Sequence, residues 1–267
     1  MSFFNSGIRI EFQNKIPTMH APTLICGFPG TGYVGKMSVD HLIYEMKAIH
    51  LADIYCTSFP PRVIVGSDGL VELTRNSIYY SKHTESNKSD FLFVTGDSQP
   101  IDPQTEYYLA EEILNIVKKF KTSLVITMGA YITGTFSDKP KVYCAATHNR
   151  ALQLVGGENI VHLNEGTVTG MNGLILGISK LFKMEGICLL GETSGYVMDA
   201  IASKNVLHAL MRVMNIKVVM QNIENRAKDT EMLIRTIEQQ VANKMTSSPQ
   251  IGGQGSSKRQ PDTGYIS

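Results

Sequence analysis

The segment Leu24-Ile25-Cys26-Gly27-Phe28-Pro29-Gly30-Thr31-Gly32-Tyr33-Val34-Gly35 decides the fold of this chain of 267 residues. An apolar run breaks into glycines and then enters an amphipathic stretch, which predicts a strand, a tight loop and the start of a helix. The glycines at 30, 32 and 35 match G-x-G-x-x-G, a spacing that lets backbone N–H groups approach a phosphate at a helix N-terminus. The same glycines also suit a buried strand that turns sharply into a helix packed close against a sheet. Both interpretations are open, and the sequence favours the second.

Strand and helix patterns alternate along the rest of the chain. Continuous apolar runs at 91–95, 124–128 and 186–190 are typical of parallel strands buried on both faces. Helical patterns follow from about residue 103, from 174 to 184 and around 206–214. A hairpin is predicted at 62–73, because Asp68-Gly69 supplies the positive φ angles of a tight turn. These patterns predict an α/β fold with a mostly parallel sheet, which the hairpin makes mixed, and with helices on both faces.

Composition excludes several classes of protein. Lys and Arg number 25 against 24 Asp and Glu, so the formal charge of +1 gives no general attraction to nucleic acid or to an anionic membrane. No stretch reaches the roughly 18 apolar residues of a membrane span, and the N-terminus lacks the pattern of a signal peptide. We therefore expect a cytoplasmic protein without nucleic-acid or membrane partners. Buried reduced thiols, rather than disulfides or metal ligands, are expected at the four widely spaced cysteines Cys26, Cys56, Cys144 and Cys188.

The C-terminal part has a different pattern. We expect an α/β domain over 1–221, a heptad-patterned helix over 222–245 and a disordered tail over 246–267, where Ser, Gly, Gln and Pro replace apolar residues. The helix either associates with itself or a partner, or packs on its own domain. Its apolar seam alternates spacings of four and three through Ile223, Ala227, Thr230, Ile234, Ile237 and Val241.

The loops that follow the parallel strands should meet at one rim of the sheet, where open α/β folds bind ligands. One hypothesis is therefore a phosphate- or nucleotide-binding transferase or hydrolase. Its rim residues would be Gly30, Gly32, Asp97, Glu165 and Glu192.

The known phosphate-site patterns are incomplete, however. Met37 follows Gly35-Lys36 where a P-loop needs the hydroxyl of Ser or Thr to hold Mg²⁺. Asp53 stands about 20 residues downstream, as the acid of a dinucleotide fold would, but such a match is common in a chain with 24 acids. An Asp directly after a strand, such as Asp97, caps a loop more often than it catalyses. We accordingly assign no catalytic, cofactor or metal-binding residue.

Five loops in order resemble the PAC2 family, which comprises the proteasome assembly chaperones and their archaeal relatives. They are Gly27-Phe28-Pro29-Gly30, Thr95-Gly96-Asp97-Ser98-Gln99-Pro100, Gly129-Ala130-Tyr131, Thr169-Gly170-Met171-Asn172-Gly173 and Gly191-Glu192-Thr193. The resemblance implies a three-layer α/β/α fold similar to nucleoside phosphorylases. It also implies no catalysis, no cofactor and homo-oligomers that hold proteasome α-subunits during assembly.

Some members of that family dock on the proteasome through a C-terminal motif of a hydrophobic residue, Tyr and any residue. This chain ends Tyr265-Ile266-Ser267, which places its Tyr third from the end rather than second. The leading hypothesis is a non-catalytic chaperone of archaeal proteasome assembly, and a structural oligomer with another partner is a further one. The residues expected to bind the partner are Tyr265, Ile266, Ile234, Ile237 and Val241.

Overall fold

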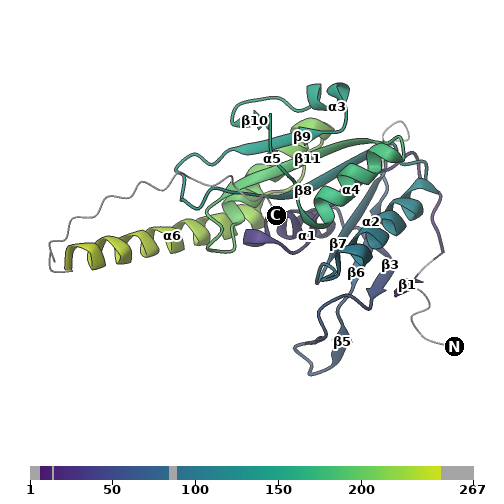
Figure 1. The fold of residues 1–267 in the computed structure, drawn as a ribbon, viewed down its shortest axis with the longest axis horizontal. Coiled ribbons are helices and arrows are strands. Elements are labelled where there is room, and N and C mark those ends of the chain that lie inside the picture. Colours follow the sequence, from purple (N-terminus) through teal and green to yellow (C-terminus); the bar gives the residue numbers. More distant parts are fainter. Residues whose placement is uncertain (1–6, 14, 84–88, 248–267) are drawn as a thin grey trace.

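A nine-stranded mixed sheet forms the centre of the computed structural model, which describes residues 7–13, 15–83 and 89–247 (Figure 1). Its central strands β7, β2, β8 and β11 are parallel, whereas β1, β3 and β6 add antiparallel strands at one side. On the other side β9 runs antiparallel to β11 and parallel to β10. In spatial order the strands are β1 (Ile8–Phe12), β3 (Ile49–Cys56), β6 (Asn76–Ser81), β7 (Phe91–Gly96), β2 (Thr23–Cys26), β8 (Leu124–Ile132), β11 (Glu185–Thr193), β9 (Val142–Ala146) and β10 (Ile160–His162).

Helices cover both faces of this sheet. On one face α2 (Pro103–Lys118) packs beside α4 (Gly170–Leu181). On the other face α1 (Val34–Glu45) packs beside α5 (Ala200–Met214), which in turn carries α6 (Gln221–Ser247). A short helix, α3 (Asn149–Gln153), follows β9, and a 3-10 turn, η1 (Thr31–Tyr33), precedes α1. The predicted three-layer α/β/α architecture with a mixed sheet is confirmed.

The sequence pattern explains the two cores. Along β2 the side chains of Leu24 and Cys26 enter the core beneath α2 and α4, while Ile25 enters the core beneath α1 and α5. Such alternation makes a strand with two buried faces read as a continuous apolar run. At the start of α2 the Asp102 side chain accepts a 2.8 Å hydrogen bond from the Thr105 backbone N–H, which satisfies one of the free donors of the first turn.

The hairpin at 62–73 differs from its prediction. It forms, but β4 (Val63–Val65) and β5 (Val71–Leu73) pair only with each other, outside the main sheet. The main sheet is mixed because β1, β3, β6 and β9 are antiparallel to neighbours. Gly69 has the positive φ of the turn, at +80°. The hairpin projects from the body, at the bottom of Figure 1.

The first part of α6 belongs to the core. Ile223, Ala227 and Thr230 are buried, since α6 packs along α5 at its start. The helix then extends away from the body (Figure 1). The division into 1–221, 222–245 and 246–267 stays a prediction, and the predicted tail lies outside the described residues from 248 onward. None of the helices within the described ranges is long and apolar enough to span a bilayer.

Candidate functional site

The glycine loop between β2 and α1 is built for close backbone packing. A Cβ on Gly27 would overlap the carbonyl oxygen of Gly35, and a Cβ on Gly35 would overlap the carbonyl oxygen of Met128 in β8. Gly32 has a φ of +63°, in the left-handed region that favours glycine. These glycines therefore let α1 start in direct backbone contact with the sheet.

The loops after the parallel strands meet, as the sequence predicts. The Gln99 side chain joins two of them, because its Nε2 donates to the Pro29 carbonyl at 2.6 Å and its Oε1 accepts from the Met171 N–H at 2.8 Å. On the other side of the glycine loop the Asp199 N–H donates to the Gly32 carbonyl at 2.9 Å. Segments far apart in sequence thus form one rim.

The space enclosed by this rim is small. The cavity measures about 30 Å³, which is room for about one or two water molecules. Pockets that bind small molecules usually measure about 300–1,000 Å³. In this conformation the rim cannot admit a nucleoside or a nucleotide. The cavity is lined by Phe28, Gly30, Thr31, Gly35, Gln99, Gly129, Ala130, Thr169, Gly170 and Asn172.

The three rim carboxylates lie in different places, and none lines this cavity. Asp97 accepts from the Arg75 N–H at 3.2 Å, beside β6. Glu192 accepts from the Lys141 N–H at 2.8 Å, and Glu165 is exposed in the loop before α4. Within the described ranges no group of three or more His, Cys, Asp or Glu side chains could hold a metal ion.

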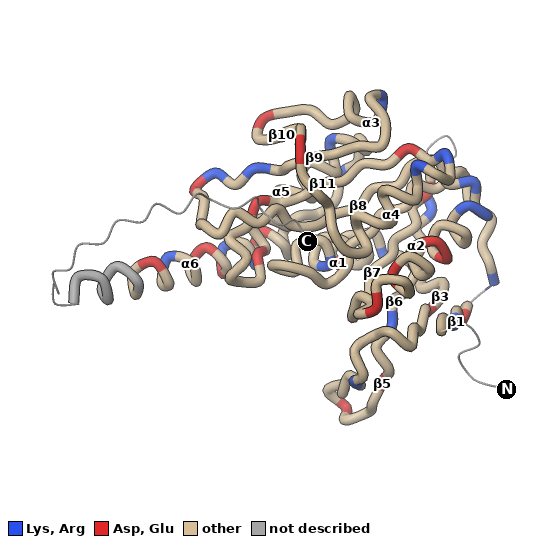
Figure 2. Tube along the Cα trace, in the orientation of Figure 1, with Lys and Arg blue, Asp and Glu red and all other residues tan. Residues whose placement is uncertain are grey.

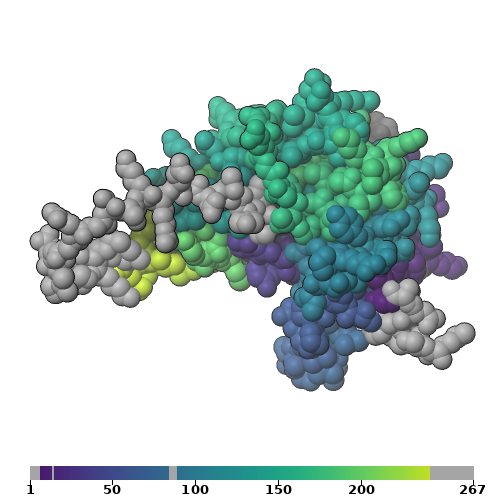
Figure 3. Space-filling view, viewed as in Figure 1, coloured from purple at the N-terminus to yellow at the C-terminus, as the bar shows by residue number. Residues whose placement is uncertain are grey.

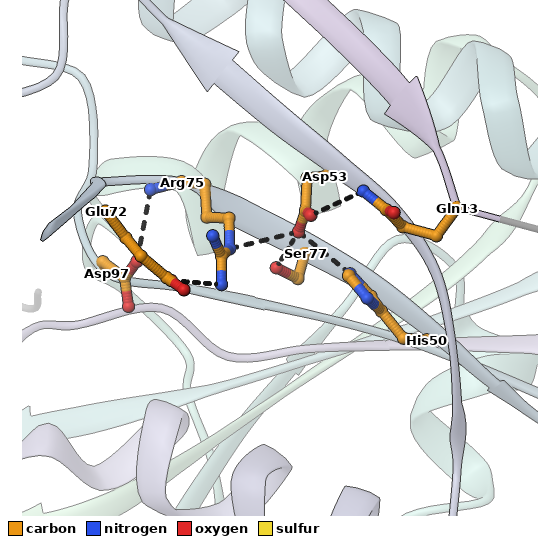
Figure 4. Close-up of polar contacts among 7 residues, drawn as sticks. All are labelled: Gln13, His50, Asp53, Glu72, Arg75, Ser77 and Asp97. Atoms are coloured by element: carbon orange, nitrogen blue, oxygen red, sulfur yellow. Dashed lines mark hydrogen bonds and ion pairs between the residues drawn. The ribbon is translucent and has the colours of Figure 1, made fainter. Parts of the chain in front are cut away.

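A polar cluster missed by the sequence analysis centres on Asp53 of β3 (Figure 4). The Asp53 side chain is only 4% exposed. Its carboxylate accepts from Ser77 Oγ at 2.6 Å and from Gln13 Nε2 at 3.1 Å. His50 Nε2 lies 2.9 Å and Arg75 Nε 3.3 Å from Asp53 Oδ1. The cluster therefore links β1, β3 and β6 through one buried carboxylate.

This cluster has the components of a catalytic triad in the wrong order. In a Ser-His-Asp triad the imidazole stands between the serine and the carboxylate, so that it can take the hydroxyl proton. Here Asp53 stands between Ser77 and His50 (Figure 4), so the Ser77 hydroxyl donates to a carboxylate rather than to an imidazole. Arg75 is held as a cation: burial works to lower its pKa, but Asp53, a hydrogen bond with Tyr55, and Glu72 raise it above the usual value. The contacts of Asp53 hold the strands at this edge of the sheet together.

A hollow of about 450 Å³ lies between α1 and the projecting hairpin, next to this cluster. It is lined by side chains that include Lys36, Asp40, Glu72 and Arg75. Its two cations already have anionic partners, because Lys36 pairs with Asp40 at 3.1 Å and Arg75 pairs with Glu72 at 2.7 Å. The hollow therefore has no unpaired lysine or arginine among its lining residues for a phosphate group.

All four cysteines are free and buried, as the sequence predicts. Burial raises the pKa of Cys188 to about 12 and that of Cys144 to about 11. Burial also raises the pKa of Cys26 and of Cys56. Because only the thiolate is nucleophilic, none of these side chains is suited to covalent catalysis near neutral pH.

We expect the native protein to resist a thiol reagent at pH 8. Fewer than about one thiol per chain should react within minutes, whereas all four should react in guanidinium chloride. The absorbance released during labelling with an aromatic disulfide measures how many thiols react in the native protein and how many react in guanidinium chloride. Rapid labelling of two or more thiols in the native protein would contradict the burial described here.

Exposed apolar side chains gather on two projecting elements. One is the β4–β5 hairpin, which stands off the body in Figure 3 and carries few charges in Figure 2. The other is the outer part of α6, where Met232 and Leu233 are exposed and Ile234 and Ile237 are half-exposed. The structure describes the helix backbone at Val241 but not its side chain, and Tyr265 and Ile266 lie outside the described residues. These elements suit contact with another protein.

Comparison with known proteins agrees with this fold. A sequence profile described as the PAC2 family matches residues 24–238. The protein MJ1210 of Methanocaldococcus jannaschii is 34% identical over 216 residues, which cover 80% of this chain and 82% of the relative.

Two solved structures from Pyrococcus furiosus share the architecture. PbaB, described as an archaeal proteasome activator, superposes with a TM-score of 0.81 at 35% identity, over 87% of this chain and 99% of that one. PbaA, described as an archaeal homologue of a proteasome-assembly chaperone, has a TM-score of 0.70 at 22% identity, over 90% of this chain and 95% of that one, and shows the fold alone. With a profile match over most of its length and a full-length relative above 30% identity, this chain belongs to the PAC2 family.

Proposed function

We propose that this protein is a non-catalytic, proteasome assembly chaperone-like factor that binds proteasome α-subunits in the cytoplasm. The observation that carries the proposal is the similarity to PbaB, at 35% identity over almost the whole of both chains. PbaB is described as a proteasome activator, so the shared element of the proposal is binding to the proteasome.

The site geometry supports a binding role. A cavity of about 30 Å³ at the glycine rim leaves no space for a nucleotide, and the Asp53 cluster does not have the serine–imidazole–carboxylate order of a catalytic triad. Exposed apolar side chains on the hairpin and on outer α6 supply surface for protein contacts. The features that stand out are therefore interaction surfaces.

The contact with α-subunits is proposed to involve outer α6 and the tail beyond it. Ile234 and Ile237 continue the apolar seam past its buried part, and both side chains are only half-buried. Val241 continues the heptad spacing, and Tyr265 and Ile266 provide an apolar, aromatic terminus. The helix would present these groups at a distance from the body.

Two variants separate the tail from the helix. Truncation after Thr246 removes Tyr265 and Ile266, and Ile234→Glu with Ile237→Glu disrupts the seam in the full chain. We expect each to weaken binding to immobilised α-subunits by at least about tenfold, which corresponds to about 1.4 kcal/mol. Glu238→Gln on the same exposed helix is the matched control and should bind as the unmodified chain does. Unchanged affinity in both variants would remove α6 and the tail from the proposal.

A second assay distinguishes an assembly role from an activating role. For assembly, added protein should raise the yield of proteasome particles from separate subunits without changing peptide hydrolysis by mature particles. For activation, it should raise peptide hydrolysis by mature particles. If it did neither while still binding, the binding would not serve the proposed role.

The nucleotide-binding alternative predicts that its ligand raises the melting temperature, whereas the chaperone proposal predicts no such rise. A ligand that binds the folded state at 100 times its Kd raises the unfolding free energy by about 2.7 kcal/mol. We expect nucleosides, nucleotides and inorganic phosphate to shift the melting temperature by less than about 1 °C at millimolar concentration. Differential scanning fluorimetry measures the shift, and a dose-dependent rise of several degrees would support the alternative.

A further inference from the structure

The β4–β5 hairpin, residues 63–73, has one aliphatic face, formed by Val63, Val65, Val71 and Leu73, and a second face where Ile64 lies opposite Glu72. It is hereafter called the blade. Six of its large aliphatic side chains are between 41% and 68% exposed, which far exceeds the scattered apolar residues of an ordinary surface. Figure 3 shows the blade standing clear of the body. These side chains are Val63, Ile64, Val65, Leu70, Val71 and Leu73.

The backbone of the blade is as exposed as its side chains. The two strands of three residues pair only with each other, in the register Val63 with Leu73 and Val65 with Val71. An isolated two-stranded ribbon is marginally stable in water, and it normally needs another strand or a packing surface. The blade therefore has the properties of an element that is covered in an assembly.

A groove of about 520 Å³ lies at the root of the blade. One wall is the blade itself, through Val63 and Leu73. The other is the segment around Phe59, Pro60 and Pro61. Side chains on a strand alternate between faces, so Val65 and Val71 lie on the same blade face as Val63 and Leu73. The groove therefore has an apolar surface similar in chemistry to the blade.

The charges of blade and groove are complementary. Among the described residues that line the groove, Arg62 alone is charged. On the blade, Glu72 is paired with Arg75 at 2.7 Å, which leaves Asp68, exposed in the tip loop, as the other acid. Arg62 precedes β4 and Asp68 follows it by three residues, so about 3.3 Å per residue along the strand keeps them apart in one copy. The strand length does not limit the approach of Asp68 from a second copy, so that residue can reach Arg62 of the first.

We propose that two copies of this chain associate by placing the blade of each in the groove of the other. The contact is isologous, with Asp68 of each copy beside Arg62 of the second copy. The four half-exposed side chains of the aliphatic face offer on the order of 300 Å² of apolar surface in each copy. Two such faces bury roughly 600 Å², and the groove residues from Phe59 to Arg62 of both copies add to this area, toward the roughly 1,000 Å² that a specific interface needs. The inference does not depend on the proposed binding to α-subunits.

The first test places a charge on the blade. Sedimentation velocity of the full chain should show a dimer or a larger species, and Val65→Glu should raise the dissociation constant of the blade contact at least 100-fold. Leu181→Glu is the matched control, because Leu181 is an exposed aliphatic residue at the end of α4, away from the blade. Equal melting temperatures would show that all three proteins fold. A monomeric unmodified chain, or unchanged association in Val65→Glu, would overturn the proposal.

The second test uses the charge pair. Arg62→Asp and Asp68→Arg should each weaken association about tenfold, because each places like charges at both contacts. An equimolar mixture of the two single variants should regain association, because every contact then joins opposite charges across two copies. Arg62→Asp also loses hydrogen bonds to the Asp97 carbonyl and Ser98 Oγ, so the double variant Arg62→Asp/Asp68→Arg is the check on folding. A mixture that associates no better than its components would overturn the proposed exchange even if α-subunits still bind.

Discussion

Gly35→Ala is expected to destabilise the protein by about 3 kcal/mol, at the upper end of the usual cost of overpacking. The added Cβ would overlap the carbonyl oxygen of Met128, an atom of the rigid backbone of β8 that cannot rotate away. The helix α1 would have to move outward from the sheet, with loss of contacts around Val34 and Val39. Thermal unfolding should show a melting temperature lower by roughly 6–12 °C.

Gly177→Ala is the matched control for this experiment. Gly177 is an exposed residue within α4, and a Cβ there would meet no atom within 4 Å. Alanine stabilises a helix interior relative to glycine by roughly 0.5–1 kcal/mol, so this variant should melt at the same temperature or slightly higher. If Gly35→Ala retained full stability, the packing explanation of the glycine loop would be wrong. Retained stability of Gly35→Ala together with lost phosphate binding would instead favour a phosphate loop.

Asp53→Ala is expected to cost about 3 kcal/mol of unfolding free energy, the lower end for breaking a buried charge pair. The substitution leaves the Arg75 guanidinium with Glu72 as its remaining carboxylate and removes the buried acceptor of Ser77 Oγ and Gln13 Nε2. Because the cluster joins β1, β3 and β6, the loss should be greatest at that edge of the sheet. Urea unfolding measures the free energy, and amide hydrogen exchange measures the local loosening.

Two further variants sharpen this test. Asp53→Asn keeps an oxygen acceptor but removes the charge, so its cost should be smaller, about 1–2 kcal/mol. Asp138→Ala removes an exposed acid on the loop after β8 and should change stability by less than about 0.5 kcal/mol. Equal stability of Asp53→Ala and Asp138→Ala would show that the buried carboxylate does not stabilise the edge.

The sequence predicted those parts of the fold that depend on local pattern. Apolar runs located β7, β8 and β11, and Asp102-Pro103 located the start of α2, because burial on two faces and helix capping both mark the local sequence. The meeting of the loops at one rim also followed, since strands of a parallel sheet end on the same side. Periodicity alone, in contrast, could not place the hairpin at 62–73. Its strands have the apolar, β-branched composition of ordinary sheet strands, and only the three-dimensional arrangement shows that they pair outside the main sheet.

The candidate site was less predictable, because its properties depend on distances between remote residues. The glycine pattern fits both a phosphate loop and a packing loop, and the overlap of a Gly35 Cβ with Met128 distinguishes them only in three dimensions. Asp53 matched the spacing of a dinucleotide-binding acid, whereas its partners are Ser77 on β6 and Gln13 directly after β1. A usable signal was present, since Ala52-Asp53-Ile54 places an acid inside an apolar strand, where it needs such partners.

Binding to proteasome α-subunits is the most direct test of the central proposal. Purified full-length protein should be titrated into purified α-subunits and followed by sedimentation velocity, with the Ile234→Glu/Ile237→Glu variant alongside. The proposal predicts a complex with a Kd of about 10 µM or tighter, equivalent to about −7 kcal/mol, and weaker binding by the variant. No complex at protein concentrations of about 100 µM would contradict the proposal.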